Sequence, residues 1–396
     1  MKKVFVILLA CLSVFIAGNQ PDIVAPYLAK SCHSLNPENT DLSFMGTDLN
    51  RQVFLSGAQW HGTTYNYDLH YALITALNRQ AGVKYMLLDS GYATAQVYND
   101  YLQTGNPELL KMALNGIRFS NSSSDEHRLF WENLYHYNQG LSPKDKIEVI
   151  GIDVEYQIST AISYLYFISD NQLADYYPVT EYLGDTKTLN AYVTGLKAKY
   201  QEDPKEFENF FGDNLQHFEC ILQSLTDTVA TDRSRNYFAD REKLMYANFL
   251  AAYNKDPQGK FFGHFTMEHI YQRQVQTGNL ADADRLGMLL VQEDSPVRDQ
   301  VVSIAAFYHD SEFRFYYGRY ENYRVFNSFI VDPLPAIKTA ANDYTIYKLE
   351  GADSPFTWDT HTVIHPTGGV TTDYYQYLLI IKNSQPTSPN FLPPHQ

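Results

Sequence analysis

Residues 53–63 read Val53-Phe54-Leu55-Ser56-Gly57-Ala58-Gln59-Trp60-His61-Gly62-Thr63. The apolar run 53–56 ends at a glycine, which is typical of a buried strand. Residues 65–80 then carry leucines and alanines at helical spacing, so they predict a helix. A strand followed directly by a helix is the unit from which parallel sheets are built. The connection between the two is polar and holds the imidazole of His61.

The same alternation continues along the chain in both directions from this unit. We predict further strands at 85–88, 147–152, 261–262, 301–307 and 377–381, and helices at 93–103, 126–138, 207–225, 237–253 and 281–291. Alternation of this kind indicates an α/β fold with a mostly parallel sheet flanked by helices. The stretch 156–255 is mainly helical, and we expect it to be an insertion or cap.

The chain divides into five expected parts. These are a signal peptide (1–20), an N-terminal part of the α/β core with the His61 motif (21–155), the helical insertion or cap (156–255), a C-terminal part of the core (256–384) and a Pro-rich flexible tail (385–396).

The first twenty residues have the pattern of an export signal. Lys2 and Lys3 precede the uncharged apolar run 4–17, which is too short to span a bilayer comfortably but suits a secretory signal. We therefore expect an exported protein, which is periplasmic, secreted or held at the surface. A lipid anchor through Cys11 is the alternative to simple cleavage. The remaining cysteines, Cys32 and Cys220, either form a disulfide or stay unpaired.

Composition excludes several classes of function. Hydrophobic residues make up 44 % of the 396 residues, which excludes an intrinsically disordered chain. The net charge of −15 argues against a nucleic-acid partner, because such binders need a basic face. The sequence holds no G-x-S-x-G, H-E-x-x-H, P-loop or G-x-G-x-x-G motif, and no cysteine pair at metal-ligand spacing. Nothing in it specifies the oligomeric state.

Polar side chains follow four of the predicted strands. Because parallel strands bring their carboxyl ends to one rim, we expect these residues to lie together. They are Gln59, Trp60 and His61 after the first strand, Asp89 and Tyr92 after the second, Asp153 after the third, and His264 and His269 after the fourth. Imidazoles and carboxylates at one rim suffice for general acid–base work on water. Simpler interpretations exist: Asp89 as a helix cap, His264 as a buried core histidine, and Arg241 as a solvated helical charge.

The motifs resemble those of the erythromycin esterase family, of which the chain looks like a divergent member. Residues 57–63 resemble the family's Gly-Glu-x-x-His-Gly-Thr motif, with Ala58 where the family has glutamate. Further similar segments follow in the family's order over about residues 50–310. They are Leu88-Asp89-Ser90-Gly91-Tyr92, Tyr101-Leu102-Gln103-Thr104-Gly105, Trp131 to Asn138, Gly151-Ile152-Asp153, Arg241-Glu242 with Met245 and Asn248, and Gly263-His264 with His269.

The resemblance implies a hydrolase that uses neither a metal nor another cofactor. By position, His61 would be the general base that activates water, His269 the second histidine, and Asp89 the replacement for the family's second glutamate. Gln59, Trp60, Tyr92, Asp153, Arg241 and His264 would line the binding site.

Three functions remain open on the sequence. The first is an exported esterase-like hydrolase acting on a small ester or lactone. The second is a catalytically degenerate relative that binds a ligand, such as a glycan, lipid or other small molecule, and it is motivated by Ala58. The third is a metal-dependent hydrolase, since His61, Asp89, Asp153 and His269 have ligand chemistry. In each case we expect the pocket to open towards residues 156–255.

Overall fold

A mixed sheet forms the centre of the molecule. The computed structural model describes residues 23–58, 62–118, 120–276, 283–316, 323–327, 334–363 and 365–389. The sheet order is β1-β9-β10-β6-β2-β5-β3-β4, and β7 and β8 form a separate hairpin. The strands are β1 (Cys32–Ser34), β2 (Val53–Ala58), β3 (Tyr85–Leu88), β4 (Glu148–Gly151), β5 (Phe261–Thr266), β6 (Val301–His309), β7 (Glu312–Tyr316), β8 (Tyr323–Asn327), β9 (Tyr344–Lys348) and β10 (Tyr377–Lys382).

Strands β10, β6, β2, β5, β3 and β4 run parallel to their neighbours, whereas β9 is antiparallel to β10 and β1 is antiparallel to β9. Ala58 at the end of β2 pairs with Thr266 of β5, and Leu88 of β3 pairs with Gly151 of β4. The carboxyl ends of these four strands therefore meet at one edge of the sheet. The α/β fold class predicted from the sequence is confirmed.

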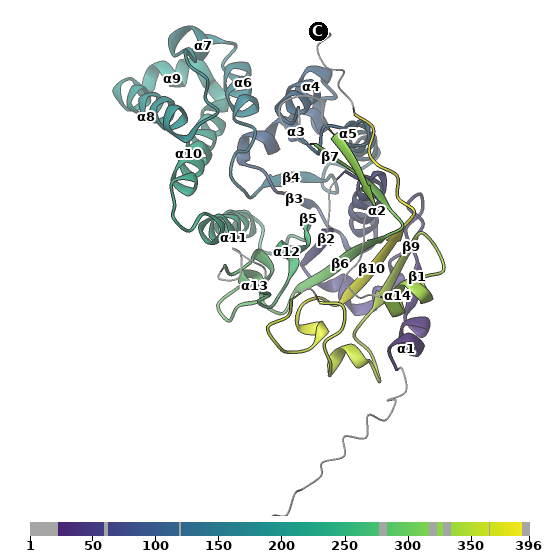
Figure 1. Ribbon diagram of the computed structural model, residues 1–396. Coiled ribbons are helices and arrows are strands. Elements are labelled where there is room, and N and C mark those ends of the chain that lie inside the picture. The colour runs from purple at the N-terminus through teal and green to yellow at the C-terminus, as the bar shows by residue number, and fades with distance from the viewer. Residues whose placement is uncertain are drawn as a thin grey trace, which may run out of the picture.

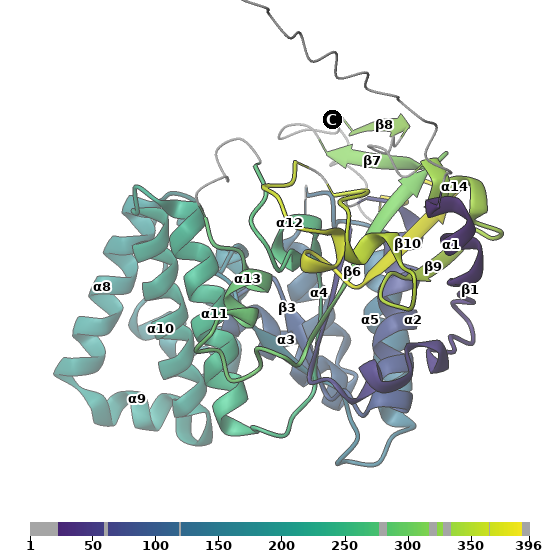
Figure 2. The same cartoon turned by 90° about the horizontal axis from the view of Figure 1, so that it is seen from below.

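Helices cover both faces of the sheet (Figures 1 and 2). They are α1 (Val24–Lys30), α2 (Thr64–Ala81), α3 (Tyr92–Thr104), α4 (Pro107–Gly116), α5 (Asp125–Gln139), α6 (Ile158–Ile168), α7 (Gln172–Tyr176), α8 (Thr186–Glu202), α9 (Pro204–Phe211), α10 (Leu215–Asp232), α11 (Tyr237–Lys255), α12 (Met267–Ile270), α13 (Leu286–Val291) and α14 (Leu334–Thr339). In the part of the chain that the structure describes, none of them has the length and apolar character needed to cross a membrane.

Two apolar cores lie on opposite faces of the sheet. Phe54 of β2 packs into the core formed with α2, α3 and α5, while its neighbours Val53 and Leu55 pack into the core formed with α11, α12 and α13. Every residue of β2 is buried, which explains why the sequence shows a continuous apolar run there rather than an alternating one.

Helices α7, α8 and α9 stand away from the sheet, and α10 connects them to it (Figure 1). The single helix predicted over 207–225 is wrong, because the chain breaks into α9 and α10 at Gly212. Gly212 has φ +49°, a left-handed conformation that favours glycine. The apolar sides of α8, α9 and α10 pack on each other around Phe207, Phe211 and Phe218.

The chain end crosses the N-termini of α2 and α5. Thr64 of α2 donates its backbone N–H to the Gln385 carbonyl at 2.9 Å, and Asp125 of α5 donates to the Ser388 carbonyl at 2.9 Å. These bonds satisfy donors that a helix start leaves without a partner inside the helix. The first residues of the expected flexible tail are therefore hydrogen-bonded to the core, and residues 390–396 lie outside the described part.

Candidate functional site at the carboxyl edge of the sheet

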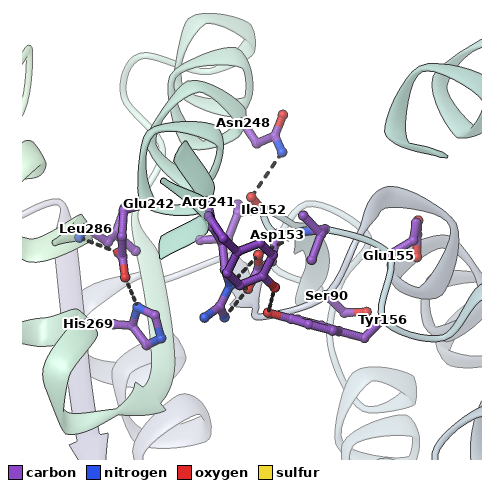
Figure 3. Close-up of polar contacts among 12 residues, drawn as sticks. Ser90, Ile152, Asp153, Glu155, Tyr156, Arg241, Glu242, Asn248, His269 and Leu286 are labelled. Carbon is purple, nitrogen blue, oxygen red and sulfur yellow. Dashed lines mark hydrogen bonds and ion pairs between the residues drawn. The ribbon is translucent and has the colours of Figure 1, made fainter. Parts of the chain in front are cut away.

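A buried ion pair lies just beyond β4. The carboxylate of Asp153 is fully buried and accepts two bonds from Nε of Arg241, at 2.9 and 3.0 Å, and a further one from Nη2 (Figure 3). Burial alone would lower the pKa of Arg241, but the bonds to Asp153 outweigh it and raise that pKa. The guanidinium also lies 5.3 Å from the ring centroid of Tyr156. The arginine is thus fixed, charged and only 14 % exposed.

The residue after Arg241 holds the second predicted histidine. Nδ1 of His269 lies 2.8 Å from Oε1 of Glu242, and both side chains are buried (Figure 3). Arg285 donates to the same carboxylate at 3.0 Å, and the backbone N–H of Leu286 does so at 2.8 Å. Burial would raise the pKa of Glu242, but His269 and Arg285 outweigh it and lower that pKa. The carboxylate is therefore ionised at neutral pH.

A charged carboxylate at Nδ1 determines how this imidazole can act. A neutral ring with its proton on Nδ1, the nitrogen 2.8 Å from the Glu242 carboxylate, keeps a lone pair on Nε2 that can accept a proton or a hydrogen bond. The approach of the Glu242 oxygen to Nδ1 favours this tautomer. The arrangement is that of a histidine oriented by an acid, which is a recurring design for general base catalysis.

Glu242 is a site residue that the sequence analysis did not assign. It stands in the Arg241-Glu242 segment of helix α11, where an exposed charge is the usual outcome. The one sequence feature that could have indicated Glu242 is its neighbour Arg241, which was already among the predicted site residues. Arg241 and Glu242 together connect the two ends of the network, Asp153 after β4 and His269 after β5.

A third buried carboxylate, that of Glu155, lies at the N-terminus of α3. It accepts hydrogen bonds from the backbone N–H of Ala93 (2.5 Å) and from the hydroxyls of Thr94 (3.1 Å) and Ser224 (3.2 Å). A Cβ on Gly91 would clash with this carboxylate, so glycine is required there. Burial raises the pKa of Glu155 to about 7, against the opposing effect of these bonds. No role was predicted for Glu155 from the sequence.

The two predicted site residues after β3, Asp89 and Tyr92, lie in different surroundings. Asp89 directly follows β3 at this edge and is half-buried. It is not the N-cap of α3, a position that Gly91 takes without a side-chain cap. Tyr92 begins α3, and its hydroxyl lies 2.9 Å from Nδ1 of His217 on α10. Tyr92 therefore faces the cap helix rather than the His269 network.

His264 lies inside a strand rather than after one. The predicted strand 261–262 runs on to Thr266, because His264 is accommodated by polar neighbours in the core under α2. Its Nε2 lies 2.8 Å from Oδ1 of Asn66, and its ring stacks on His70 at 4.8 Å. It faces α2, whereas Phe265 packs in the core on the α11 side with His269. His264 therefore packs against α2, and its place in a binding site with His269 stays a prediction.

Residues Gln59, Trp60 and His61 lie outside the described residues, but the chain on either side of them is held firmly. Ala58 is 1 % exposed and packs in an apolar core. The Gly62 carbonyl accepts from the backbone N–H of Arg314 at 2.8 Å and from that of Thr387 at 2.9 Å. Gly62 has φ +91°, and a Cβ on it would clash with the Arg314 carbonyl.

No metal site or disulfide is found among the residues that the structure describes. In that part of the chain, no group of three or more His, Cys, Asp or Glu could hold a metal ion. Cys32 and Cys220 are both free.

Comparison with solved structures places this geometry in a known fold. A crystal structure of a Bacillus cereus protein has a TM-score of 0.65 and 14 % identity, covering 93 % of this chain and 98 % of that one. A crystal structure of a succinoglycan biosynthesis protein gives 0.62 and 15 %, with the same coverage. An erythromycin esterase mutant in its open conformation gives 0.60 and 12 %, covering 91 % of this chain and all of that one.

The chain has an erythromycin esterase-like fold. The resemblance drawn from the motifs of the sequence is thereby confirmed at the level of the fold. At these identities the likeness concerns the fold alone. No family model matches the sequence, and no curated protein matches it.

Proposed function

We propose that this protein is a hydrolase that activates water against a small ester or lactone without a metal. The observation that carries the proposal is the His269–Glu242 pair, which stands beside the Arg241–Asp153 ion pair at the carboxyl edge of the sheet. The erythromycin esterase-like fold supports a hydrolase-like or ligand-binding role, because one of the solved structures with this fold is named as an esterase.

The residues divide the chemistry as follows. His61 would take a proton from water, in the role that the sequence resemblance gives it. His269, held by Glu242, would supply a second imidazole with a free Nε2. Arg241 uses Nε and Nη2 on Asp153, and in the described residues its Nη1 has no hydrogen-bond partner. A fixed cation with one free donor would stabilise the charge that develops on the carbonyl oxygen during attack.

The cavity nearest to this network that could take a substrate is lined by Tyr156, which packs on Arg241, but not by Arg241, Glu242 or His269 themselves. A cavity of about 730 Å³ opens between the loop after β4 and the helical stretch that follows it. Its wall is amphipathic, with Tyr156 and Tyr182 beside Ile162, Val179 and Leu189. A pocket of this size and character suits a small ester with an apolar part.

We further propose that the protein is exported, on the basis of its N-terminal Met1-Lys2-Lys3 and apolar run 4–17. Fractionation of expressing cells tests this, because the mature protein would leave the cytoplasm with its first residues removed or with Cys11 lipidated. Retention of the full-length chain in the cytoplasm would contradict it.

The test of hydrolysis uses p-nitrophenyl esters of short acids. We expect the parent protein to turn them over and His61→Ala to lose about 10²–10⁴-fold in kcat/KM, the usual effect of removing a general base. Equal rates in parent and variant would remove His61 from the mechanism.

A second candidate, binding without turnover, is favoured by Ala58. Its methyl group is buried at the position where the resembling motif has a glutamate. If this candidate holds, the parent protein is inactive on all esters tried and Ala58→Glu gains activity. Robust activity of the parent would end it.

A further inference from the structure

Helix α10 turns a polar face towards the sheet. Its apolar face, which includes Phe218, Ile221 and Leu225, is buried in the cap. The other face carries polar residues at helical spacing, and they line a cavity together with residues of β4 and α11. These are Gln216, His217, Cys220, Gln223, Ser224 and Asp227. Polar side chains on the inner face of a helix need polar partners, either in the protein or in a bound ligand.

A cavity of about 600 Å³ separates this polar face from the sheet. Its other walls come from β4, from α11 and from the tyrosines Tyr85 and Tyr92. The volume lies within the range of small-molecule sites. The cavity shares Asp153 with the ion-pair network of the candidate site, but neither Glu242 nor His269 lines it.

Several lining groups are already held in place by one another. The Tyr92 hydroxyl lies 2.9 Å from His217, Tyr85 donates to Asp256 at 2.9 Å, and Gln223 donates to Asp227 at 2.8 Å. These bonds fix the orientation of two tyrosine rings and of two carboxylates in the wall. Fixed groups of this kind are what a ligand site needs.

Other lining groups are left uncommitted. In the described residues, the side-chain amides of Gln96 and Gln216, which line the cavity, make no hydrogen bond. Glu148 forms no ion pair there, although the charges of Lys255 and Lys84 oppose the rise in its pKa that burial causes. Gln96 stands on α3 and Gln216 on α10, so free amides face the cavity from two different helices. Each amide supplies both donors and an acceptor.

The chemistry of these groups selects the class of ligand. Amides, hydroxyls and an imidazole in one wall match a neutral molecule with many hydroxyls, because both partners donate and accept. Tyrosine rings add flat apolar surface with a polar end. The carboxylates of Glu148, Asp227 and Asp256 outnumber the one lysine, Lys255, which disfavours phosphates and other anions.

We propose that the cavity between α10 and β4 is a saccharide-binding site that lies beside the hydrolytic edge and shares Asp153 with it. A mono- or disaccharide there would bridge the uncommitted amides of α3 and α10 and so tie the cap to the core. The proposal does not depend on ester hydrolysis, since none of its contacts involves His61 or His269.

Cys220 gives a direct readout, because this half-buried thiol lines the cavity. The full protein is alkylated with iodoacetamide alone or with glucose, galactose, N-acetylglucosamine or lactose. Mass spectrometry of the Cys220 peptide gives the rate, and the Cys32 peptide serves as an internal control. At a concentration ten times Kd, mass action predicts about tenfold slower alkylation of Cys220 by at least one of these sugars, with Cys32 unchanged.

Substitutions of the two amides test whether the sugar that protects Cys220 binds in this cavity. We expect Gln96→Leu and Gln216→Leu each to weaken the protection, while Gln201→Leu, at an exposed position on α8, leaves it intact. Three results would overturn the proposal: alkylation at the same rate with every sugar, protection by spermidine or phosphate instead, or full protection in both cavity variants.

Discussion

Two neighbouring residues on one helix, Arg241 and Glu242, reach different partners and join the site together. Successive side chains on a helix point about 100° apart, so Arg241 meets Asp153 and Glu242 meets His269. Both carboxylates are buried, and each is matched by a cation or an imidazole. A buried charge of this kind is tolerated because it is paired.

The first prediction concerns Glu242→Gln. The amide keeps the size of the side chain but removes the charge that fixes the proton on Nδ1 of His269. We expect kcat/KM for ester hydrolysis to fall by about 10²-fold or more, as for other acids that orient a catalytic histidine. Glu293→Gln, at an exposed position, is the matched control. Activity of Glu242→Gln equal to that of this control would rule out an orienting role.

The second prediction concerns Glu155 and pH. Because burial raises its pKa to about 7, the folded protein holds a proton there that the unfolded chain, with an ordinary pKa near 4.5, has released. Stability from this group is thus complete below about pH 4.5 and is lost as the pH rises through 7.

Urea unfolding of the parent and of Glu155→Gln tests this. The uncharged variant carries no such penalty, so its stability relative to the parent should rise between about pH 5 and pH 8. Gln can still accept the bond from the Ala93 N–H, which keeps the N-terminus of α3 satisfied. A difference in stability that does not change with pH would contradict the prediction.

At the scale of elements, side chains from two helices hydrogen-bond the outer backbone edge of strand β4. Asn138 of α5 donates to the Ile147 carbonyl at 2.8 Å and accepts from its N–H at 2.9 Å. Asn99 of α3 does the same for Val149, at 2.8 Å in both directions. These amides imitate a neighbouring strand and leave no backbone edge at 147 and 149 for another chain to pair with.

The third prediction follows from this arrangement. Asn138→Ala leaves a buried N–H and a buried carbonyl without partners, which should reduce the free energy of unfolding by roughly 2–4 kcal/mol. Asn254→Ala, on the exposed side of α11, should change it little. Chemical denaturation measures the free energy of unfolding of both variants. Equal values would contradict the prediction, because water would then replace the Asn138 amide without a loss of stability.

The C-terminal segment is a second element that fixes the site. Its residues satisfy the first N–H groups of α2 and α5 and, through Thr387, the carbonyl of Gly62 beside the His61 motif. The segment therefore holds the loop after β2 from outside the sheet.

The fourth prediction compares two truncations. A chain that ends at Ser384 loses these three backbone bonds but keeps those of Ser384, and it should be about 2–4 kcal/mol less stable, at about 1 kcal/mol for each bond. A chain that ends at Pro389 keeps them and should match the parent. Equal thermal midpoints of the two truncated proteins would show that the segment does not support the fold.

At the scale of the whole molecule, the sequence predicts the sheet better than the site. Buried parallel strands produce uninterrupted apolar runs, so β2, β3, β6 and β10 are visible in the sequence. The end of β5 is not, because Gly263 and His264 interrupt its run while still lying inside the strand. Glu242 and Glu155 escaped assignment because their burial depends on partners far away in the chain, Arg285 and Ser224.

The most direct test of the account is the hydrolysis of a p-nitrophenyl ester by His269→Ala, compared with His136→Ala on the exposed face of α5. The account predicts that kcat/KM falls by about 10²-fold or more in the first and stays at the parent value in the second. Equal activity of the two variants, with both folded, would contradict the claim that the carboxyl edge of the sheet is the catalytic site.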